Sequence, residues 1–190
     1  DDTTFSFSRK VLDRANTIEF NDVRLEVLDF ELLNLIKPLD LDNSCFKTRF
    51  ISIKDALAFD KDYVVKINNQ IIEINNILAM GNKHFGYRIR DQINFYLLEN
   101  KENKLLDESL AFDYQIMQKI LPTITGSDRV IKDILIELYN YCNLDGQIIG
   151  DIDYINYAEE NLETALYPKS ANKILMMLRG YEDGFASFWQ

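Results

Sequence analysis

The stretch DKDYVVKINNQIIEINNILAMG, residues 60–81, decides the fold class of this 190-residue chain. Its apolar residues recur at steps of three and four, so they share one face of an amphipathic helix. That face consists of Val64, Ile67, Ile71, Ile74 and Leu78. Asp60 or Asp62 can cap the start of this helix, and Gly81 can end it.

Similar periodic segments follow toward the C-terminus and predict helices at roughly residues 87–100, 106–121 and 128–143. Their apolar stripes are Ile89/Ile93/Leu97, Leu110/Met117/Leu121 and Ile131/Leu135/Leu138. A loop that could contain a short strand, residues 147–157, separates them from a final helix at 170–181. Ser170 is the expected N-cap of that helix, because it follows Pro168 directly upstream of the periodic pattern.

The N-terminal part of the sequence is mixed in pattern. Residues 6–12 predict a helical turn, residues 17–20 a short strand, and residues 23–28 a second extended piece. Residues 37–60 carry several turn-forming residues and predict an irregular linker. The expected fold class is therefore mainly α: a helical bundle over residues 61–190, with a short α/β remnant at the N-terminus.

Composition limits the classes of function. With 31 acidic and 21 basic residues the net charge is −10, which disfavours direct binding of nucleic acid by this chain. Cys45 and Cys142 are far apart and have no metal-ligand spacing, so reduced thiols and a cytoplasmic location are expected. No apolar run approaches the roughly 20 residues that cross a bilayer. The sequence begins at Asp1 without a methionine, which suggests a piece of a longer protein.

Several tracts carry a resemblance to a known family. They are SRKVLDRANTIEF (residues 8–20), YPKSANK (167–173) and DGFASFW (183–189), supported by residues 86–95 and 111–126. Together they resemble the C-terminal part of McrB-type AAA+ nucleoside triphosphatases, the motor subunits of modification-dependent restriction systems. The blocks cover less than half of the chain, and Gly180 stands where the family pattern is closer to an arginine. The resemblance implies the end of an AAA+ core at 1–36, a linker at 37–60 and a helical lid at 61–190.

Arg14 is the candidate catalytic residue that the resemblance implies. It matches the arginine finger, a guanidinium group that reaches across a subunit boundary and stabilises charge developing on the γ-phosphoryl group. Arg9 and Lys10 lie on the same helical turn and are the reserve candidates. From spacing alone, an ordinary surface arginine paired with Asp13 or Glu19 is the favoured interpretation. With the flanking Leu-Asp-Arg-Ala-Asn included, the two interpretations are equally open.

Arg90 and Arg88 are the candidate nucleotide-binding residues. The resemblance places them at the start of the lid helix, where an arginine called sensor 2 folds back onto the nucleotide phosphates; Arg90 matches that position better than Arg88. A positive side chain near a helix N-terminus opposes the helix dipole, so its position there brings no local stabilisation. The open alternative is an ion pair with Asp91 or a neighbouring acid.

The sequence lacks the phosphate-binding loop G-x-x-x-x-G-K-[S/T] and the acidic pair that would hold magnesium. This segment alone is therefore not expected to bind or hydrolyse a nucleotide, and no metal ligands are assigned; His84, the single histidine, is expected in a loop. In the intact protein the resemblance implies GTP or ATP with magnesium, a ring of identical subunits, and a nuclease subunit as a further partner.

A different class of function stays open: a standalone, acidic, helical interaction module without catalysis. It would bind a protein partner through the aromatic tail, residues 185–189. The simpler expectation for that tail is a hydrophobic plug that docks the C-terminus onto the bundle.

Overall fold

The computed structural model describes residues 7–20, 40–47, 49–50, 52–150 and 153–189. Within these ranges the protein is mainly helical and contains no strand beyond one isolated bridge between Gly126 and Ala186, so the predicted mainly α fold is confirmed. The α-helices are α1 (Arg9–Leu12), α2 (Ile53–Phe59), α3 (Lys61–Ala79), α4 (Tyr87–Asn103), α5 (Glu108–Gln115), α6 (Arg129–Cys142), α7 (Tyr154–Glu160) and α8 (Pro168–Glu182). Shorter turns are η2 (Asn43–Phe46), η3 (Ile116–Ile120), η4 (Leu121–Thr123) and η5 (Leu162–Thr164).

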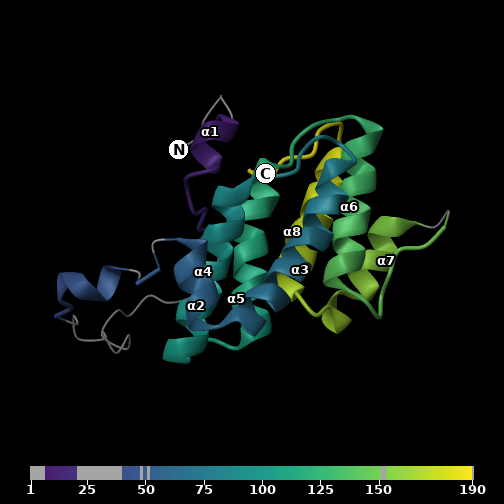
Figure 1. The fold of residues 1–190 in the computed structure, drawn as a ribbon. Coiled ribbons are helices and arrows are strands. Elements are labelled where there is room, and N and C mark those ends of the chain that lie inside the picture. Colours follow the sequence, from purple (N-terminus) through teal and green to yellow (C-terminus); the bar gives the residue numbers. More distant parts are fainter. Residues whose placement is uncertain (1–6, 21–39, 48, 51, 151–152, 190) are drawn as a thin grey trace, which may run out of the picture.

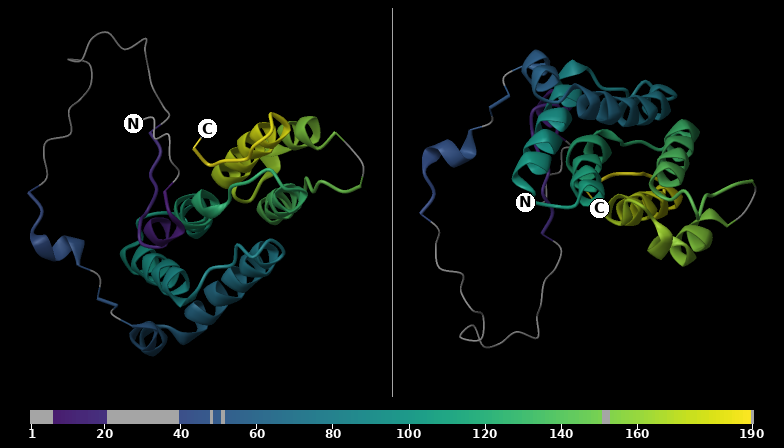
Figure 2. Two further views of the ribbon diagram at one scale, coloured as in Figure 1. Left: turned by 90° about the horizontal axis from the view of Figure 1, so that it is seen from above. Right: turned by 60° about the horizontal axis from the view of Figure 1, so that its bottom comes forward.

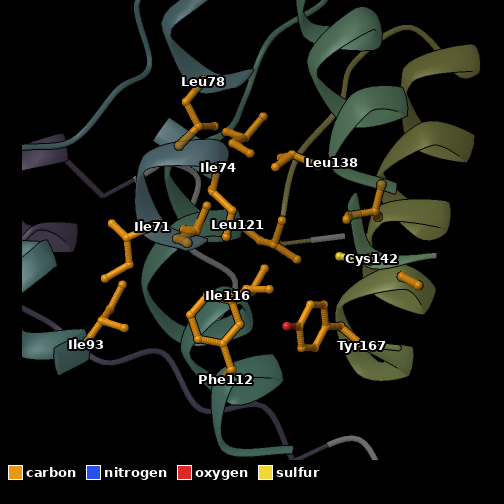
Figure 3. Close-up of a cluster of buried hydrophobic side chains, with 14 of the residues drawn as sticks. Ile71, Ile74, Leu78, Ile93, Phe112, Ile116, Leu121, Leu138, Cys142 and Tyr167 are labelled. Carbon is orange, nitrogen blue, oxygen red and sulfur yellow. The ribbon is translucent and has the colours of Figure 1, made fainter. Parts of the chain in front are cut away.

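The helix α5 and its continuation η3 run through the middle of the bundle (Figure 1). Seen from above, α3 and α4 lie on one side of this central segment, and α6 and α8 pack along each other on the other side (Figure 2, left). Buried side chains from both sides meet around Phe112 and Ile116 (Figure 3). The core between them is built from buried side chains of all these helices, among them Ile74, Ile93, Phe112, Leu138 and Ile174. The described helices therefore share a single apolar core.

Helix α3 follows the sequence prediction closely. All five residues of its predicted apolar face are buried, and Asp60 caps its start by accepting a hydrogen bond from Tyr63 N at 3.1 Å. The segment before it differs from expectation, because α2 lies within the predicted irregular linker. Ser52 and Asp55 form a capping box that starts α2, and α2 packs against α3 and α4.

The predicted helix at 106–121 changes type within its length. It is α-helical as α5, becomes a π-helix at η3 and ends in the 3-10 turn η4. A π-helical turn holds more residues than an α-helical one, so it rotates the buried face. The predicted stripe is therefore partly wrong: Leu110 and Met117 are only partly buried, whereas Phe112, Ile116 and Ile120 fill the core.

Helix α8 begins at Pro168, and the prediction of Ser170 as its N-cap is wrong. The cap is supplied by Asp113 of α5, whose carboxylate accepts hydrogen bonds from Lys169 N at 2.9 Å and Ser170 N at 2.8 Å. The Ser170 hydroxyl donates to the same carboxylate. Burial raises the pKa of the Asp113 carboxyl, and these hydrogen bonds partly offset the rise.

The connection between α6 and α8 is organised by Asn143. Its side-chain oxygen accepts hydrogen bonds from Gly146 N at 3.0 Å and Thr164 Oγ1 at 3.1 Å, and its amide nitrogen donates to Asn161 O at 2.7 Å. Residues 147–157 contain no strand within their described part; α7 begins there instead and packs on α8. Satisfying this buried amide thus fixes the path of the loop.

The N-terminal prediction is met only in part. A helical turn is present as α1, but the strand predicted at residues 17–20 is not found: these residues belong to no helix and no sheet. The extended piece predicted at residues 23–28 lies outside the described residues. The described part of the N-terminus is therefore one segment, residues 7–20, which we call the strap.

Candidate functional site

The strap lies across the helical body, and its first half is fixed by Arg9 (Figure 2). The Arg9 guanidinium donates hydrogen bonds to the carbonyl oxygens of Asn82 at 3.4 Å and Lys83 at 3.3 Å, and also to that of His84. These carbonyls follow the C-terminal end of α3, where the helix dipole is negative and favours a cation. Docking of α1 therefore uses backbone groups of the turn between α3 and α4.

The middle of the strap binds where Pro122 interrupts the central helix. In an α-helix the carbonyl of Gln118 would accept a hydrogen bond from the residue four positions later, but that residue is Pro122, which has no N–H. Thr17 N of the strap donates to this carbonyl at 3.2 Å. The strap thus satisfies a backbone acceptor that Pro122 cannot satisfy.

Lys119 holds the strap one residue further along the π-helix. Its side chain is only 3% exposed, and its ammonium group donates a hydrogen bond to Ala15 O at 2.7 Å. Burial lowers the pKa of Lys119, and the nearby carboxylate of Asp13 partly opposes that shift. A buried ammonium group needs partners, and the strap carbonyl is the one that the structure provides.

Lys173 of α8 fixes the end of the strap. It is 4% exposed, its ammonium group lies 2.6 Å from Glu19 Oε1, and it sits 4.4 Å from the centre of the Phe188 ring. Glu19 is partly exposed, so the ion pair is buried at Lys173 and accessible to solvent at Glu19. The contact joins residues 154 positions apart in the sequence.

Between strap, η3 and α8 lies a hollow of 310 Å³. Its lining includes Gln118, Asn172 and Lys173, and also Lys169, whose ammonium group lies 5.3 Å from the ring of Tyr114. We call the surface made by Gln118, Lys119, Lys173 and this hollow the strap groove. It combines an open backbone acceptor, two buried cations and apolar walls, which suits an extended chain carrying an acidic side chain.

The C-terminal tail meets the beginning of the strap. Phe188 is buried, and Ala186 pairs with Gly126 in the isolated bridge, so this part of the tail docks on the bundle. Trp189 is 43% exposed and its ring lies 5.6 Å from that of Phe7. The two ends of the described chain therefore lie side by side, as Figure 1 shows.

The predicted catalytic residue, Arg14, lies just beyond the end of α1. Its backbone N–H donates to Val11 O at 2.9 Å, and its side chain is exposed. Within the described parts of the chain its guanidinium group has no hydrogen-bond or ion-pair partner; in particular, neither Asp13 nor Glu19 is paired with it. Of the reserve candidates, Arg9 is held by carbonyls and Lys10 is exposed.

The two predicted nucleotide-binding arginines are placed differently. Arg88 pairs with Asp13 of the strap at 2.7 Å. Arg90 pairs with Asp91 at 2.6 Å, lies 4.8 Å from the centre of the Tyr87 ring and is 28% exposed. It lines a separate hollow against α3. The structure thus brings Arg88 to the strap, but sets Arg90 on another face of α4.

Sequence reasoning missed Gln118, Lys119 and Lys173. The available signal was a lysine in the middle of a periodic apolar pattern, since Lys119 adjoins Ile120 and Lys173 adjoins Ile174 on buried helix faces. A charge at such a position needs a partner, but the sequence does not say which segment supplies it.

The described residues contain no group of three or more His, Cys, Asp or Glu residues that could hold a metal ion. No helix among them has the length and apolar character needed to cross a membrane.

Comparison with protein families matches residues 31–185 to a domain of unknown function, DUF8727. No match was found among curated proteins or among solved structures. The match spans most of the helical body, including Lys119 and Lys173, and begins after the strap.

Proposed function

The chain belongs to the DUF8727 family, and we propose that it is a helical protein-interaction module whose strap groove binds an extended, acidic segment of polypeptide. The observation that carries this proposal is the burial of two lysines whose hydrogen-bond partners, Ala15 O and Glu19 Oε1, both come from an extended strap. Buried ammonium groups are costly without partners. A groove that keeps two of them is built to hold such a segment.

The mode of binding follows from the strap, which occupies the groove in this structure. One backbone N–H is recognised by Gln118 O, one backbone carbonyl by Lys119 and one carboxylate by Lys173. Backbone contacts supply affinity for any extended chain, whereas the carboxylate contact selects an acidic side chain. The net charge of −10 repels other acidic surfaces, so this recognition depends on the two lysines being concentrated in one groove.

Peptide binding to the full chain tests this proposal. The variant Glu19→Lys opens the groove by placing two cations together, and a fluorescent peptide of sequence LDRANTIEF, residues 12–20, is then titrated by anisotropy. We expect this peptide to bind about 10-fold more tightly than a matched peptide with Lys at the Glu19 position, which corresponds to one ion-pair contact of roughly 1.4 kcal/mol. Equal affinity of the two peptides would contradict the proposal.

A second candidate function is supported by Arg14. We propose, as the alternative, that the chain is the lid-containing part of an AAA+ nucleoside triphosphatase that uses GTP or ATP with magnesium in a ring of identical subunits. A trans-acting finger must be exposed and unpaired in its own subunit, and Arg14 meets that condition among the described residues. Under this proposal a nuclease subunit is the further partner, and Arg88 and Arg90 would contact nucleotide only after leaving Asp13 and Asp91.

Hydrolysis of GTP and ATP by the full-length protein tests the alternative. Subunits with Arg14→Ala are mixed with wild-type subunits, and Arg129→Ala, at an exposed arginine of α6, is the matched control. Loss of turnover with retained nucleotide binding would support an arginine finger at Arg14. Unchanged turnover in the Arg14→Ala mixture would remove that role.

A further inference from the structure

The strap is attached to the helical body through contacts that are all distant in sequence. Its hydrogen bonds, ion pairs and ring contact reach from residues 7–19 to residues 82–189, and none involves the described residues between 40 and 60. Docking of the strap therefore does not depend on the path of the chain that connects it to α2.

That connection, residues 21–52, is long enough to reach another molecule. Fully extended it can span about 100 Å at 3.3 Å per residue. The whole chain of 190 residues, when folded, has a radius of gyration of about 16 Å. Its described turn η2 lies away from the helical body (Figure 2). A strap from a neighbouring molecule would form the same contacts with the strap groove as the molecule's own strap.

We infer that the partner of the strap groove is a second copy of this chain, whose residues 7–20 are exchanged between two molecules. This inference rests on the proposed function, because it uses the same groove and names its occupant. Each copy would place Glu19 on the Lys173 of the other, and Thr17 on the other's Gln118 carbonyl. Exchange of an identical element is a low-cost route to a dimer, because every contact already exists in the monomer.

The balance between the two arrangements depends on concentration. A strap linked to its own groove has an effective concentration of about 1 mM, so exchange is minor in dilute wild-type protein. Weakening the contact within each molecule, while keeping it possible between molecules, would shift the balance to the dimer.

Two charge-reversed variants create that situation. Glu19→Lys has a faulty strap and an intact groove, whereas Lys173→Glu has an intact strap and a faulty groove. Mixed together, each strap finds its complement only on the other molecule. We expect each variant alone to be monomeric with a released strap, and the mixture to form a heterodimer as its main species in sedimentation and native mass spectrometry. The double variant in one chain is the control, and should be monomeric with a docked strap.

Strap release is measured separately, by hydrogen exchange of residues 7–20 and by the fluorescence of Trp189, which contacts Phe7. If the single variants release the strap but their mixture stays monomeric, exchange is wrong and the groove proposal survives. If the single variants keep the strap docked, the groove proposal fails and exchange fails with it. Should Lys173→Glu not fold, wild-type protein refolded at about 1 mM and at about 1 µM replaces it. A dimer fraction that does not rise with concentration would overturn the inference.

Discussion

The start of α8 and the strap are each held by buried ionisable side chains. The two regions differ in how much apolar packing also holds the segment in place. Asp113 caps α8 from within the interface between α5 and α8, where both helices are also packed by apolar residues. Lys119 and Lys173 hold a strap that adds little apolar burial, since Ile18 and Phe20 are exposed. The same kind of contact is thus structural in one region and releasable in the other.

The two regions differ in whether the group that contacts the buried charge can move into water when that charge is removed. If Asp113 is lost, the Lys169 and Ser170 N–H groups lose their acceptor and that of Ser170 stays buried, because the surrounding helices remain in place. If Lys173 is lost, Glu19 moves into water together with the strap and keeps its solvation. A buried charge therefore stabilises the fold strongly only where both partners are fixed by other packing.

The largest effect is expected for Asp113→Ala. It leaves the N–H groups of Lys169 and Ser170 without their carboxylate acceptor, and the Ser170 hydroxyl keeps only the main-chain carbonyl of residue 113. We expect the free energy of unfolding to fall by about 3 kcal/mol, measured by urea denaturation followed by circular dichroism. Ser109→Ala, at an exposed site on the same helix, is the matched control and should change little. A loss below about 1 kcal/mol would mean that α8 is capped in another way.

A somewhat smaller loss is expected for Asn143→Ala in the connection between α6 and α8. The change removes the acceptor of Gly146 N, one of the two acceptors of Thr164 Oγ1, and one of the donors to Asn161 O. We expect the free energy of unfolding to fall by about 2 kcal/mol. Asn140→Ala, which removes an amide bound only to Ile148, should cost less; equal losses would show that the Asn143 network adds nothing beyond a single loop contact.

The strap should be released by Lys173→Met with little effect on the helical body. Methionine keeps the length of the side chain but removes the cation that holds Glu19. We expect faster hydrogen exchange at residues 7–20, and a change of about 1 kcal/mol or less in the free energy of unfolding. Lys61→Met, at an exposed site of α3 outside the strap groove, is the control. Global unfolding in place of local release would remove the contrast between the two regions.

The raised pKa of Asp113 predicts the direction in which the stability of this region changes with pH. Its pKa is raised in the folded protein by burial, so the folded state binds more protons than the unfolded state just above pH 3.8. The stability contributed by protonated Asp113 is present below that pH and is lost as the pH rises through the folded pKa. Relative to Asp113→Asn, the wild type should therefore gain stability on acidification toward pH 4. A pH-independent difference between the two proteins would contradict the raised pKa.

The smallest effect is expected for Arg14→Ala. The side chain is exposed and has no partner among the described residues, so the free energy of unfolding should change by less than about 0.5 kcal/mol. Arg9→Ala, in the same strap, removes three carbonyl contacts and should loosen α1. Hydrogen exchange of residues 7–20 distinguishes them; equal exchange in both variants would show that Arg9 does not hold the strap.

Much of the helical body could be predicted from periodicity. The α3, α4 and α6 stripes are buried as expected, and Asp60 caps α3, because these features depend on neighbours within one or two turns. The stripe of α5 was partly mistaken, since the π-helical turn before Pro122 shifts the buried face. Helix α2 was not predicted, because the turn-forming residues of 37–60 indicated an irregular linker. The capping box of Ser52 and Asp55 at its start is a signal of only four residues.

The candidate site could not be predicted to the same degree. Arg14 and Arg88 were singled out, and the structure puts Arg14 on the strap and Arg88 in an ion pair with it. The groove residues Lys119 and Lys173 were missed, because nothing near them in the sequence identifies Ala15 or Glu19 as their partners.

The sequence by itself determined that this chain is mainly helical, where its longer helices lie and which face of most of them is buried. These properties follow from side-chain spacing along a regular helix, which is a local geometric relation. Only the tertiary structure decided that Asp113 caps α8, that Pro122 opens the Gln118 carbonyl to Thr17, and that two lysines hold the strap. Those contacts join residues from 56 to 154 positions apart, and only packing of the whole core fixes which distant groups meet.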